Sequence, residues 1–331
     1  MTTTTKLNYR ELAEQVLQGH ALTKEEALAL LEAPDEDLLD ILHSAYAIRK
    51  HYYGNKVKLN MIINAKSGLC PEDCGYCSQS IVADTPVEKY AMLNKESILA
   101  GAQEAIARKA GTYCIVASGR RPSDKELDGV IDAIKEIRET TSLKICACLG
   151  FLSETHASKL SEAGVNRYNH NLNTSKENYD NICSTHTYDD RVDTVTKVKE
   201  SGMSPCSGVI MGLGESPEEL VNVAFSIKSL DVDSIPVNFL NSIDGTPLET
   251  YKNLNPRQCL KAVAMFRFVN PTKEIRLSGG REINLRSLQA MGLYAANSIF
   301  VGDYLTTQGQ EPTSDWGMIQ DLGFEIEECA L

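Results

Sequence analysis

Apolar and polar residues follow two different periods along the chain. The first fifty or so residues have a helical pattern, in which leucines follow a capping box formed by Thr23 and Glu26. From Val57 onward, short apolar segments with the period of a strand alternate with longer helical segments. The predicted strands are residues 58–65, 112–118, 144–149, 166–173, 204–211, 234–241, 274–279 and 298–302.

The alternation of strands and helices predicts the fold. Ser123 with Glu126, and Ser216 followed by Pro217, are start signals for two of the intervening helices. Eight strand–helix units without an inserted domain favour parallel strands closed into a barrel, with an open doubly wound sheet as the alternative. We therefore predict an α/β fold of the (β/α)8 TIM type. Its expected parts are a helical extension at residues 1–50, the barrel at residues 51–320 and a tail at residues 321–331.

Composition and charge exclude several classes of partner. The formal net charge of −12 and the single tryptophan argue against a nucleic-acid-binding protein, which needs a basic face. No apolar run is long enough to span a membrane, and residues 1–6 lack the apolar segment of a signal peptide. We expect a cytoplasmic protein, in which the ten cysteines serve metal binding or catalysis rather than disulfides.

A short cysteine motif carries the most specific chemistry. Cys70-Pro71-Glu72-Asp73-Cys74-Gly75-Tyr76-Cys77 directly follows the first predicted barrel strand and has the spacing C-x3-C-x2-C. Three thiolates can hold three irons of a four-iron cluster and leave one iron open for a small molecule. Structural zinc, the alternative, usually pairs two short cysteine spacings, and no second pair follows here.

Polar residues share one face of most predicted strands. Because side chains alternate across a strand, Cys114, Cys146 and Cys206 should each point to the same side as polar neighbours. A polar group buried in a barrel costs roughly 1–3 kcal/mol unless it finds a partner, so this face predicts a lumen that holds polar ligands and a metal centre. A small buried thiol is the alternative for any one of them. Three cysteines lack polar company and are interpreted as ordinary residues: Cys183, Cys259 and Cys329.

These segments together resemble the radical S-adenosylmethionine superfamily and, within it, the biotin synthase family. The resemblance runs from about residue 45 to residue 325. It rests on residues 70–77, 168–175, 206–215, 236–239, 276–282 and 296–300.

The resemblance implies a sulfurtransferase that converts dethiobiotin to biotin. Cys70, Cys74 and Cys77 would hold a [4Fe–4S] cluster that binds S-adenosylmethionine at its open iron. Reductive cleavage would yield a deoxyadenosyl radical that abstracts hydrogen from two substrate carbons. An auxiliary [2Fe–2S] cluster would donate the sulfur. Its implied ligands are Cys114, Cys146, Cys206 and Arg276, although an arginine in a salt bridge is the ordinary alternative for the last.

The resemblance also implies binding residues and partners. Tyr76, Ser118, Asn171, Asn173 and Ile210 would contact S-adenosylmethionine, with Asn173 standing where some members carry aspartate. A flavodoxin or ferredoxin would supply electrons, and the family suggests a homodimer. The residues implied for dethiobiotin are Asn169, Asn171 and Asn238.

Alternatives stay open for Cys148 and for the function of the whole chain. Cys148, two residues past Cys146, is either a bystander thiol or a ligand of a larger, four-iron auxiliary cluster. His170, on the face opposite Asn169, is interpreted as a packing residue. The alternatives for the chain are another radical S-adenosylmethionine enzyme that does not insert sulfur, and an electron carrier, which would ligate each cluster fully with cysteine.

Overall fold

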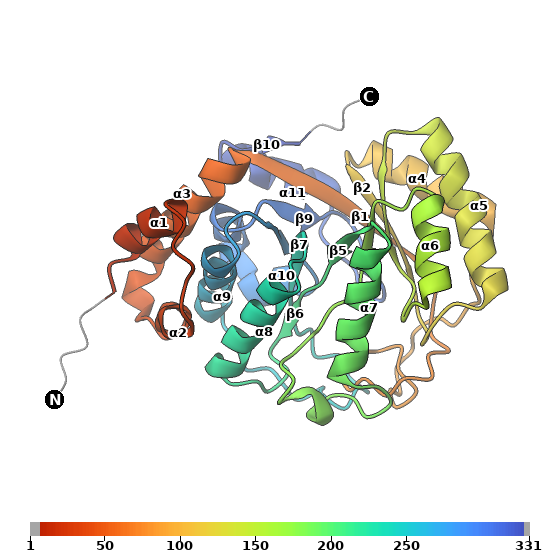
Figure 1. Cartoon of the computed structure of the whole chain (residues 1–331), viewed down its shortest axis with the longest axis horizontal. Coiled ribbons are helices and arrows are strands. Elements are labelled where there is room, and N and C mark those ends of the chain that lie inside the picture. Colours follow the sequence, from red (N-terminus) through yellow and green to blue (C-terminus); the bar gives the residue numbers. More distant parts are fainter. Residues whose placement is uncertain (1–6, 328–331) are drawn as a thin grey trace.

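The computed structural model describes residues 7–327, which form one barrel with helices around it (Figure 1). The strands are β1 (Lys56–Lys66), β2 (Thr112–Ala117), β3 (Lys144–Cys148), β4 (Arg167–Asn169), β5 (Ser204–Cys206), β6 (Val209–Met211), β7 (Ser234–Phe239), β8 (Glu274–Leu277), β9 (Ser298–Phe300) and β10 (Glu325–Ile326). The α-helices are α1 (Tyr9–Leu17), α2 (Lys24–Leu31), α3 (Leu38–Tyr53), α4 (Lys95–Ala107), α5 (Asp124–Thr140), α6 (Glu154–Glu162), α7 (Tyr188–Glu200), α8 (Pro217–Ser229), α9 (Pro256–Val269), α10 (Arg281–Leu285) and α11 (Pro312–Asp321). Short 3-10 turns are η1 (Asp35–Asp37), η2 (Tyr179–Asn181) and η3 (Arg286–Tyr294).

All strand pairings of the barrel are parallel. The order is β1-β2-β3-β4-β5-β7-β8-β9, and β9 pairs back with β1 and closes the ring. β6 follows β5 and pairs with β7, so the two short strands together occupy one strand position of the barrel. The closure confirms the predicted (β/α)8 barrel and excludes the open sheet. β10 pairs with the beginning of β1, outside the ring.

Most predicted strands end a residue or two early, and two depart further from their apolar pattern. β4 ends at Asn169, and Asn173 adopts a left-handed conformation (φ +70°), which asparagine tolerates better than most residues. The predicted strand 204–211 is interrupted at residues 207–208. Gly208 lies so close to β7 that a Cβ atom there would be 1.9 Å from the carbonyl oxygen of Pro236. Both departures come from contacts between strands, which the local pattern does not record.

The N-terminal helices are joined to the barrel by a buried arginine. α3 packs against α9, and the Arg49 side chain at its end is fully buried. Its guanidinium donates hydrogen bonds to the carbonyl oxygens of Ala296 (3.2 Å), Lys56 (2.9 Å) and Gly54. Three backbone acceptors at the start of the barrel therefore depend on this helix. Between residues 7 and 327, no helix has the length and apolar character needed to cross a membrane.

Candidate active site at the mouth of the barrel

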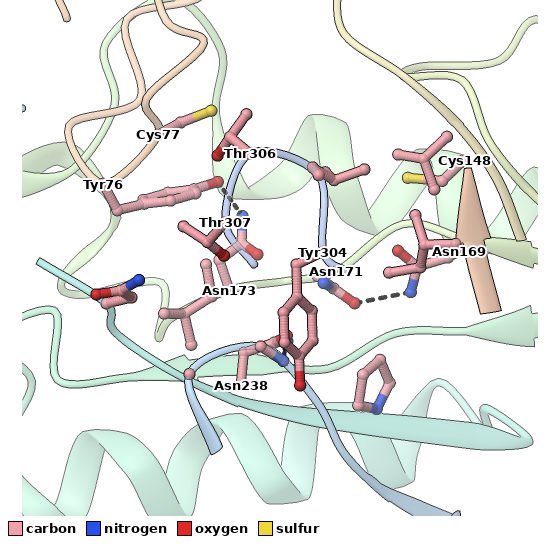
Figure 2. Close-up of a pocket in the computed structure, with 18 of the residues that line it drawn as sticks. Tyr76, Cys77, Cys148, Asn169, Asn171, Asn173, Asn238, Tyr304, Thr306 and Thr307 are labelled. Atoms are coloured by element: carbon pink, nitrogen blue, oxygen red, sulfur yellow. Dashed lines mark hydrogen bonds between the residues drawn. The ribbon is translucent and has the colours of Figure 1, made fainter. Parts of the chain in front are cut away.

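A cavity of about 370 Å³ opens at the carboxyl ends of the strands (Figure 2). Active sites of TIM barrels sit at this end, because the loops that follow the strands meet there. The predicted site residues that line it are Tyr76, Cys77, Cys114, Cys146, Cys148, Asn169, Asn171, Asn173, Ile210, Asn238 and Arg276.

The loop that carries the cysteine triad follows β1 and is held from outside the barrel. Cys77 faces the cavity, Cys74 is buried, and Cys70 lines a neighbouring depression. The Asp73 carboxylate accepts hydrogen bonds from the backbone amides of Ser184 (3.0 Å) and Thr185 (3.1 Å). The backbone N–H of Gly75 donates to the carbonyl oxygen of Ile182 (2.8 Å). The segment between η2 and α7 therefore fixes this loop.

A hydrogen-bonded chain of side chains reinforces this contact. Nδ1 of His186 lies 2.5 Å from the Glu72 carboxylate, and its Nε2 lies 2.9 Å from Nη2 of Arg191. A guanidinium can only donate, so Nε2 of His186 accepts and Nδ1 carries the proton. The imidazole of His186 therefore donates to Glu72 from Nδ1 and accepts from Arg191 at Nε2.

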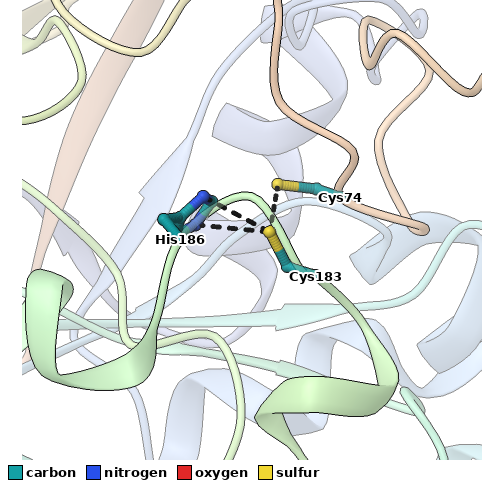
Figure 3. A group of neighbouring side chains, drawn as sticks. All are labelled: Cys74, Cys183 and His186. Atoms are coloured by element: carbon teal, nitrogen blue, oxygen red, sulfur yellow. Dashed lines mark hydrogen bonds between the residues drawn. The ribbon is translucent and has the colours of Figure 1, made fainter.

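Cys183 lies in the same segment and touches the triad. Its Sγ is 3.8 Å from Sγ of Cys74 and 3.3 Å from Nδ1 of His186 (Figure 3). The local sequence pattern indicates an ordinary residue at Cys183, because it contains no signal of a partner so far away along the chain. Cys259 is fully buried in α9, and Cys329 lies outside the described residues.

The other predicted thiols lie inside the barrel. Cys114 on β2 stands opposite Cys146 on β3 in the strand register, and Cys206 lies at the end of β5. All three are almost fully buried, and Nδ2 of Asn169 lies 3.2 Å from Sγ of Cys206. Cys148, two residues after Cys146 at the end of β3, also lines the cavity, and burial raises the pKa of its thiol to about 12.

Near these thiols lies a cluster of charges centred on the buried Glu274. Its carboxylate is 2.6 Å from Nη2 of Arg276, 3.1 Å from Nη1 of Arg167 and 3.4 Å from Nζ of Lys58. Burial alone would raise the pKa of Glu274, but the charges of Arg167 and Arg276 outweigh it and hold the pKa well below its usual range. Three cations therefore face Glu274, and a second carboxylate, that of Glu327, lies 3.8 Å from Lys58, which leaves one positive charge in excess.

This excess positive charge is chemically informative. Buried charges are costly unless they are paired, and Glu274 is the only carboxylate that contacts the buried Arg276 and the partly exposed Arg167 within residues 7–327. An iron–sulfur cluster held by three thiolates would bring the missing negative charge. The three cysteines and the cationic side chains near them therefore fit such a cluster.

Asparagine amides make a polar row on the cavity wall. Nδ2 of Asn169 donates to Oδ1 of Asn171 (2.9 Å), and Nδ2 of Asn173 donates to the Tyr76 hydroxyl (2.6 Å) (Figure 2). On β7, Nδ2 of Asn238 donates to the carbonyl oxygen of Val209 (3.0 Å). These groups can recognise a planar ligand that both donates and accepts hydrogen bonds.

Two residues, Ser118 and His170, lie in positions that differ from those predicted from the sequence. Ser118 is not one of the described residues that line the cavity. Its hydroxyl donates to the carbonyl oxygen of Gly68 (2.5 Å), beside the cysteine loop. His170 does line it, although strand alternation placed it on the opposite face, because β4 ends at Asn169. Its Nε2 has no hydrogen-bond partner within residues 7–327, and burial lowers its pKa well below the usual value.

The loop that follows β9 is a part of the site that the sequence motifs do not predict. Tyr304 and Thr307 line the mouth of the cavity, and the hydroxyl of Thr306 lies 2.8 Å from that of Ser78 in the cysteine loop (Figure 2). A loop directly after the last strand of a barrel is a general site signal, and it could have identified this segment.

Comparison with known proteins gives consistent matches. The family model described as "Radical SAM superfamily" matches residues 66–227, and the model described as "Biotin and Thiamin Synthesis associated domain" matches residues 236–325. The chain is 68% identical over 327 residues to the biotin synthase of Bacillus anthracis, covering 99% of this chain and 98% of that protein. The biotin synthase of Bacillus cytotoxicus matches with the same identity and coverage, 68% over 327 residues.

Solved structures share the fold at low identity. The crystal structure of methylornithine synthase superposes with a TM-score of 0.84 at 20% identity, covering 96% of this chain and 97% of that one. A maturase of the [FeFe]-hydrogenase gives a TM-score of 0.84 at 19% identity, covering 99% of this chain and 77% of that one. At these identities the similarity supports the barrel fold alone.

Proposed function

The chain belongs to the biotin synthase family of radical S-adenosylmethionine enzymes, and we propose that its barrel cavity inserts sulfur into dethiobiotin to form biotin. The observation that carries this proposal is the presence of two separate groups of cysteines near one cavity. Cys77 of the triad loop lines that cavity, and so do Cys114 and Cys146 inside the barrel. Enzymes of this family are sulfurtransferases that use a [4Fe–4S] cluster, S-adenosylmethionine and an auxiliary cluster. When bound, the first cluster supplies the electron that cleaves S-adenosylmethionine, and the second supplies sulfur.

We assign Cys70, Cys74 and Cys77 to the [4Fe–4S] cluster. The C-x3-C-x2-C spacing and the anchoring of the loop through Asp73 support this assignment, because a fixed loop presents its thiols in a constant arrangement. The residues proposed for S-adenosylmethionine are Tyr76, Ser118, Asn171, Asn173 and Ile210, of which Ser118 would act through the loop carbonyl that it binds.

We assign the auxiliary [2Fe–2S] cluster to Cys114, Cys146, Cys206 and Arg276. In support, Glu274 and Ser234 hold Nη2 of Arg276, and Ser298 accepts from its Nε at 3.2 Å, so the guanidinium is fixed in place. Arg276 also lines the cavity, next to the thiols. The hydrogen bond with Cys114 and burial raise the pKa of Cys146, and burial raises that of Cys206, whereas the charges of Arg276 and Arg167 oppose both shifts and favour the thiolates that a cluster needs.

Cys148 separates two forms of the auxiliary centre. Its thiol faces the same cavity as Cys146, which supports ligation of a larger, four-iron cluster as the alternative to the [2Fe–2S] form. Iron and sulfide counting on a variant with alanine at all three triad cysteines decides between them. Two irons per chain would exclude the larger cluster, and a fall in the count on adding Cys148→Ala would establish ligation.

Dethiobiotin would bind against the asparagine row. Asn169, Asn171 and Asn238 offer amides that can both donate to and accept from a ureido ring. The position of Asn169 beside Cys206 would place the substrate next to the sulfur source, which keeps the reacting atoms close. The loop with Tyr304 would exclude water from the mouth.

An anaerobic assay tests the function. Protein loaded with both clusters is given dethiobiotin, S-adenosylmethionine and a chemical reductant, and biotin and 5′-deoxyadenosine are measured. We expect both products from the wild type, and 5′-deoxyadenosine without biotin from Cys206→Ala. Absence of biotin despite full loading of both clusters would refute the proposal, and an auxiliary cluster that survives turnover would favour an enzyme that does not insert sulfur.

The setting of the enzyme is part of the proposal. Radical S-adenosylmethionine enzymes need an electron donor, and we propose a flavodoxin or ferredoxin. We also propose that the protein is a cytoplasmic homodimer without nucleic-acid or membrane partners. Its proposed parts are a helical extension at residues 1–50, the barrel at residues 51–320 and a tail at residues 321–331. The net charge of −12 supports the exclusion of nucleic acid, and light scattering after size-exclusion chromatography tests the dimer.

A further inference from the structure

The contact between Cys74 and Cys183 joins two loops that are far apart in the sequence. The two sulfur atoms are 3.8 Å apart, and both cysteines are buried (Figure 3). The backbone hydrogen bond from Gly75 to Ile182 connects the residues next to them, and Asp73 binds the amide of Ser184. The two thiols are therefore held side by side by the backbone on either side of them.

Two kinds of chemistry suit such a pair. Sγ of Cys74, Sγ of Cys183 and a ring nitrogen of His186 all lie within 4.8 Å of one another, as the ligands of one metal ion do. Zinc–sulfur bonds of about 2.3 Å in a tetrahedral site also place two sulfur atoms about 3.8 Å apart. The alternative is a covalent bond between the two sulfurs. The sulfur–sulfur distance alone does not separate these cases.

The surroundings of His186 argue against the metal. Its Nδ1–H is donated to Glu72, and its Nε2 accepts from Arg191. A histidine that binds a metal normally donates its second nitrogen to a carboxylate, carbonyl or water, whereas here binding through Nδ1 would leave a guanidinium cation behind the ring. His186 is already committed on both sides, so the two thiols remain as the reactive pair.

We propose that Cys74 and Cys183 form a disulfide when the protein has lost its [4Fe–4S] cluster. The inference rests on the proposed function only in that Cys74 is taken as a cluster ligand. The oxidant is a peroxide: one thiolate attacks an oxygen of hydrogen peroxide, the O–O bond breaks, and hydroxide leaves as water after protonation. The resulting sulfenic acid is attacked by the second thiol, which forms the S–S bond and releases a second water. Two thiols lose two electrons in all, and the peroxide gains them.

The disulfide would change the fate of the cluster-free protein. With Cys74 in the bridge, the triad lacks one of its three thiolates, so the four-iron cluster cannot be rebuilt until a dithiol reductant opens the bond. The bridge would also protect Cys74 from sulfinic and sulfonic acids, which are irreversible in most proteins. The pair would thus act as a reversible store for one cluster ligand.

Peptide mapping tests the inference directly. Cluster-free full-length protein is prepared without oxygen, treated with one equivalent of hydrogen peroxide, alkylated and digested. We expect a linked peptide that contains Cys74 and Cys183, and a loss of two free thiols per chain. A Cys259→Ser variant, which changes another buried cysteine, should give the same linked peptide. Absence of the linked peptide, a bridge from Cys74 to Cys70 or Cys77 instead, or zinc bound in equal amount by the cluster-free protein, would each overturn the inference.

Cluster rebuilding supplies a second readout. After peroxide treatment, we expect wild-type protein to rebuild no four-iron cluster at the triad until dithiothreitol is added, and dithiothreitol to restore uptake of iron and sulfide fully. In Cys183→Ser, dithiothreitol should restore uptake only in part, because Cys74 is then open to further oxidation. Equal recovery in the two proteins would count against a protective bridge. Iron uptake is independent of biotin formation, so a failed biotin assay with normal uptake would refute the proposed function and leave this inference standing.

Discussion

Replacing Glu274 with glutamine tests the charge cluster near the auxiliary cysteines. The Glu274 carboxylate is only 3% exposed and contacts Arg276 at 2.6 Å and Arg167 at 3.1 Å. Glutamine keeps the size and one acceptor oxygen but removes the negative charge. The buried Arg276 and the partly exposed Arg167 then lack a carboxylate partner among the described residues.

The magnitude follows from the burial of the partners. Removal of one member of a buried ion pair costs about 3–5 kcal/mol, and the remaining acceptor oxygen places Glu274→Gln near the lower end, at about 3 kcal/mol of unfolding free energy. An auxiliary cluster held by thiolates would supply negative charge beside the same arginines. We therefore expect a smaller loss, about 1 kcal/mol, in the loaded protein, and correspondingly tighter cluster binding by the variant.

The pH dependence of the same variant has a defined sign. The native pKa of Glu274 is depressed, so its contribution to stability is complete above the unfolded-state pKa near 4.3 and is lost as the pH falls through the lower native pKa. The difference between wild type and Glu274→Gln should therefore stay constant from about pH 6 to about pH 8.

Denaturant unfolding under nitrogen, followed by circular dichroism at both ends of that range, measures these differences. The matched control is Glu327→Gln, since Glu327 lies 3.8 Å from Lys58 but is 35% exposed and should cost less than about 1 kcal/mol. A loss below about 1 kcal/mol in cluster-free Glu274→Gln, or equal losses in the cluster-free and loaded proteins, would refute the reasoning.

Three further substitutions test other parts of the molecule. Gly208→Ala places a Cβ atom 1.9 Å from the Pro236 carbonyl oxygen and should lower the unfolding free energy by at least about 1–3 kcal/mol. Gly129→Ala, in an open part of α5, should instead raise the unfolding free energy by about 0.5–1 kcal/mol. Calorimetry compares the two variants, and equal melting temperatures would contradict the clash at Gly208. Tyr76→Phe removes a 2.6 Å hydrogen bond to an asparagine and should weaken S-adenosylmethionine binding by about 1 kcal/mol, roughly fivefold in Kd by calorimetric titration; an unchanged Kd would exclude Tyr76 from that site. Asn169→Ala should lower biotin formation while 5′-deoxyadenosine still forms, and a parallel fall in both products would place Asn169 outside the dethiobiotin site.

Most of the fold was predictable because its signals are local. The capping boxes at Thr23, Ser123 and Ser216 form as expected, and every predicted barrel strand has a counterpart. The errors lie where other strands decide the conformation. Asn173 leaves the strand because it pairs with Val209 instead, which a one-dimensional pattern does not contain.

The candidate site was predictable in its residue types but not in its supports. The triad spacing and the alternation of Cys114, Cys146 and Cys206 with polar residues can be recognised from sequence. Cys183 and Glu274, in contrast, gain their importance from partners that only the closed barrel brings near. The mouth loop with Tyr304 lacks any chemically distinctive residue, so only its place after the last strand indicates a role.

The buried Arg49 side chain has a practical consequence for anyone who wishes to reduce this protein to a minimal scaffold. A shortened version that begins at β1 would leave the carbonyl oxygens of Lys56 and Ala296 without the guanidinium that they now share. Unsatisfied acceptors there favour local fraying of β1 and β9, the two strands whose pairing closes the barrel. The smallest useful catalyst derived from this chain should therefore retain α3 as an integral part of the barrel.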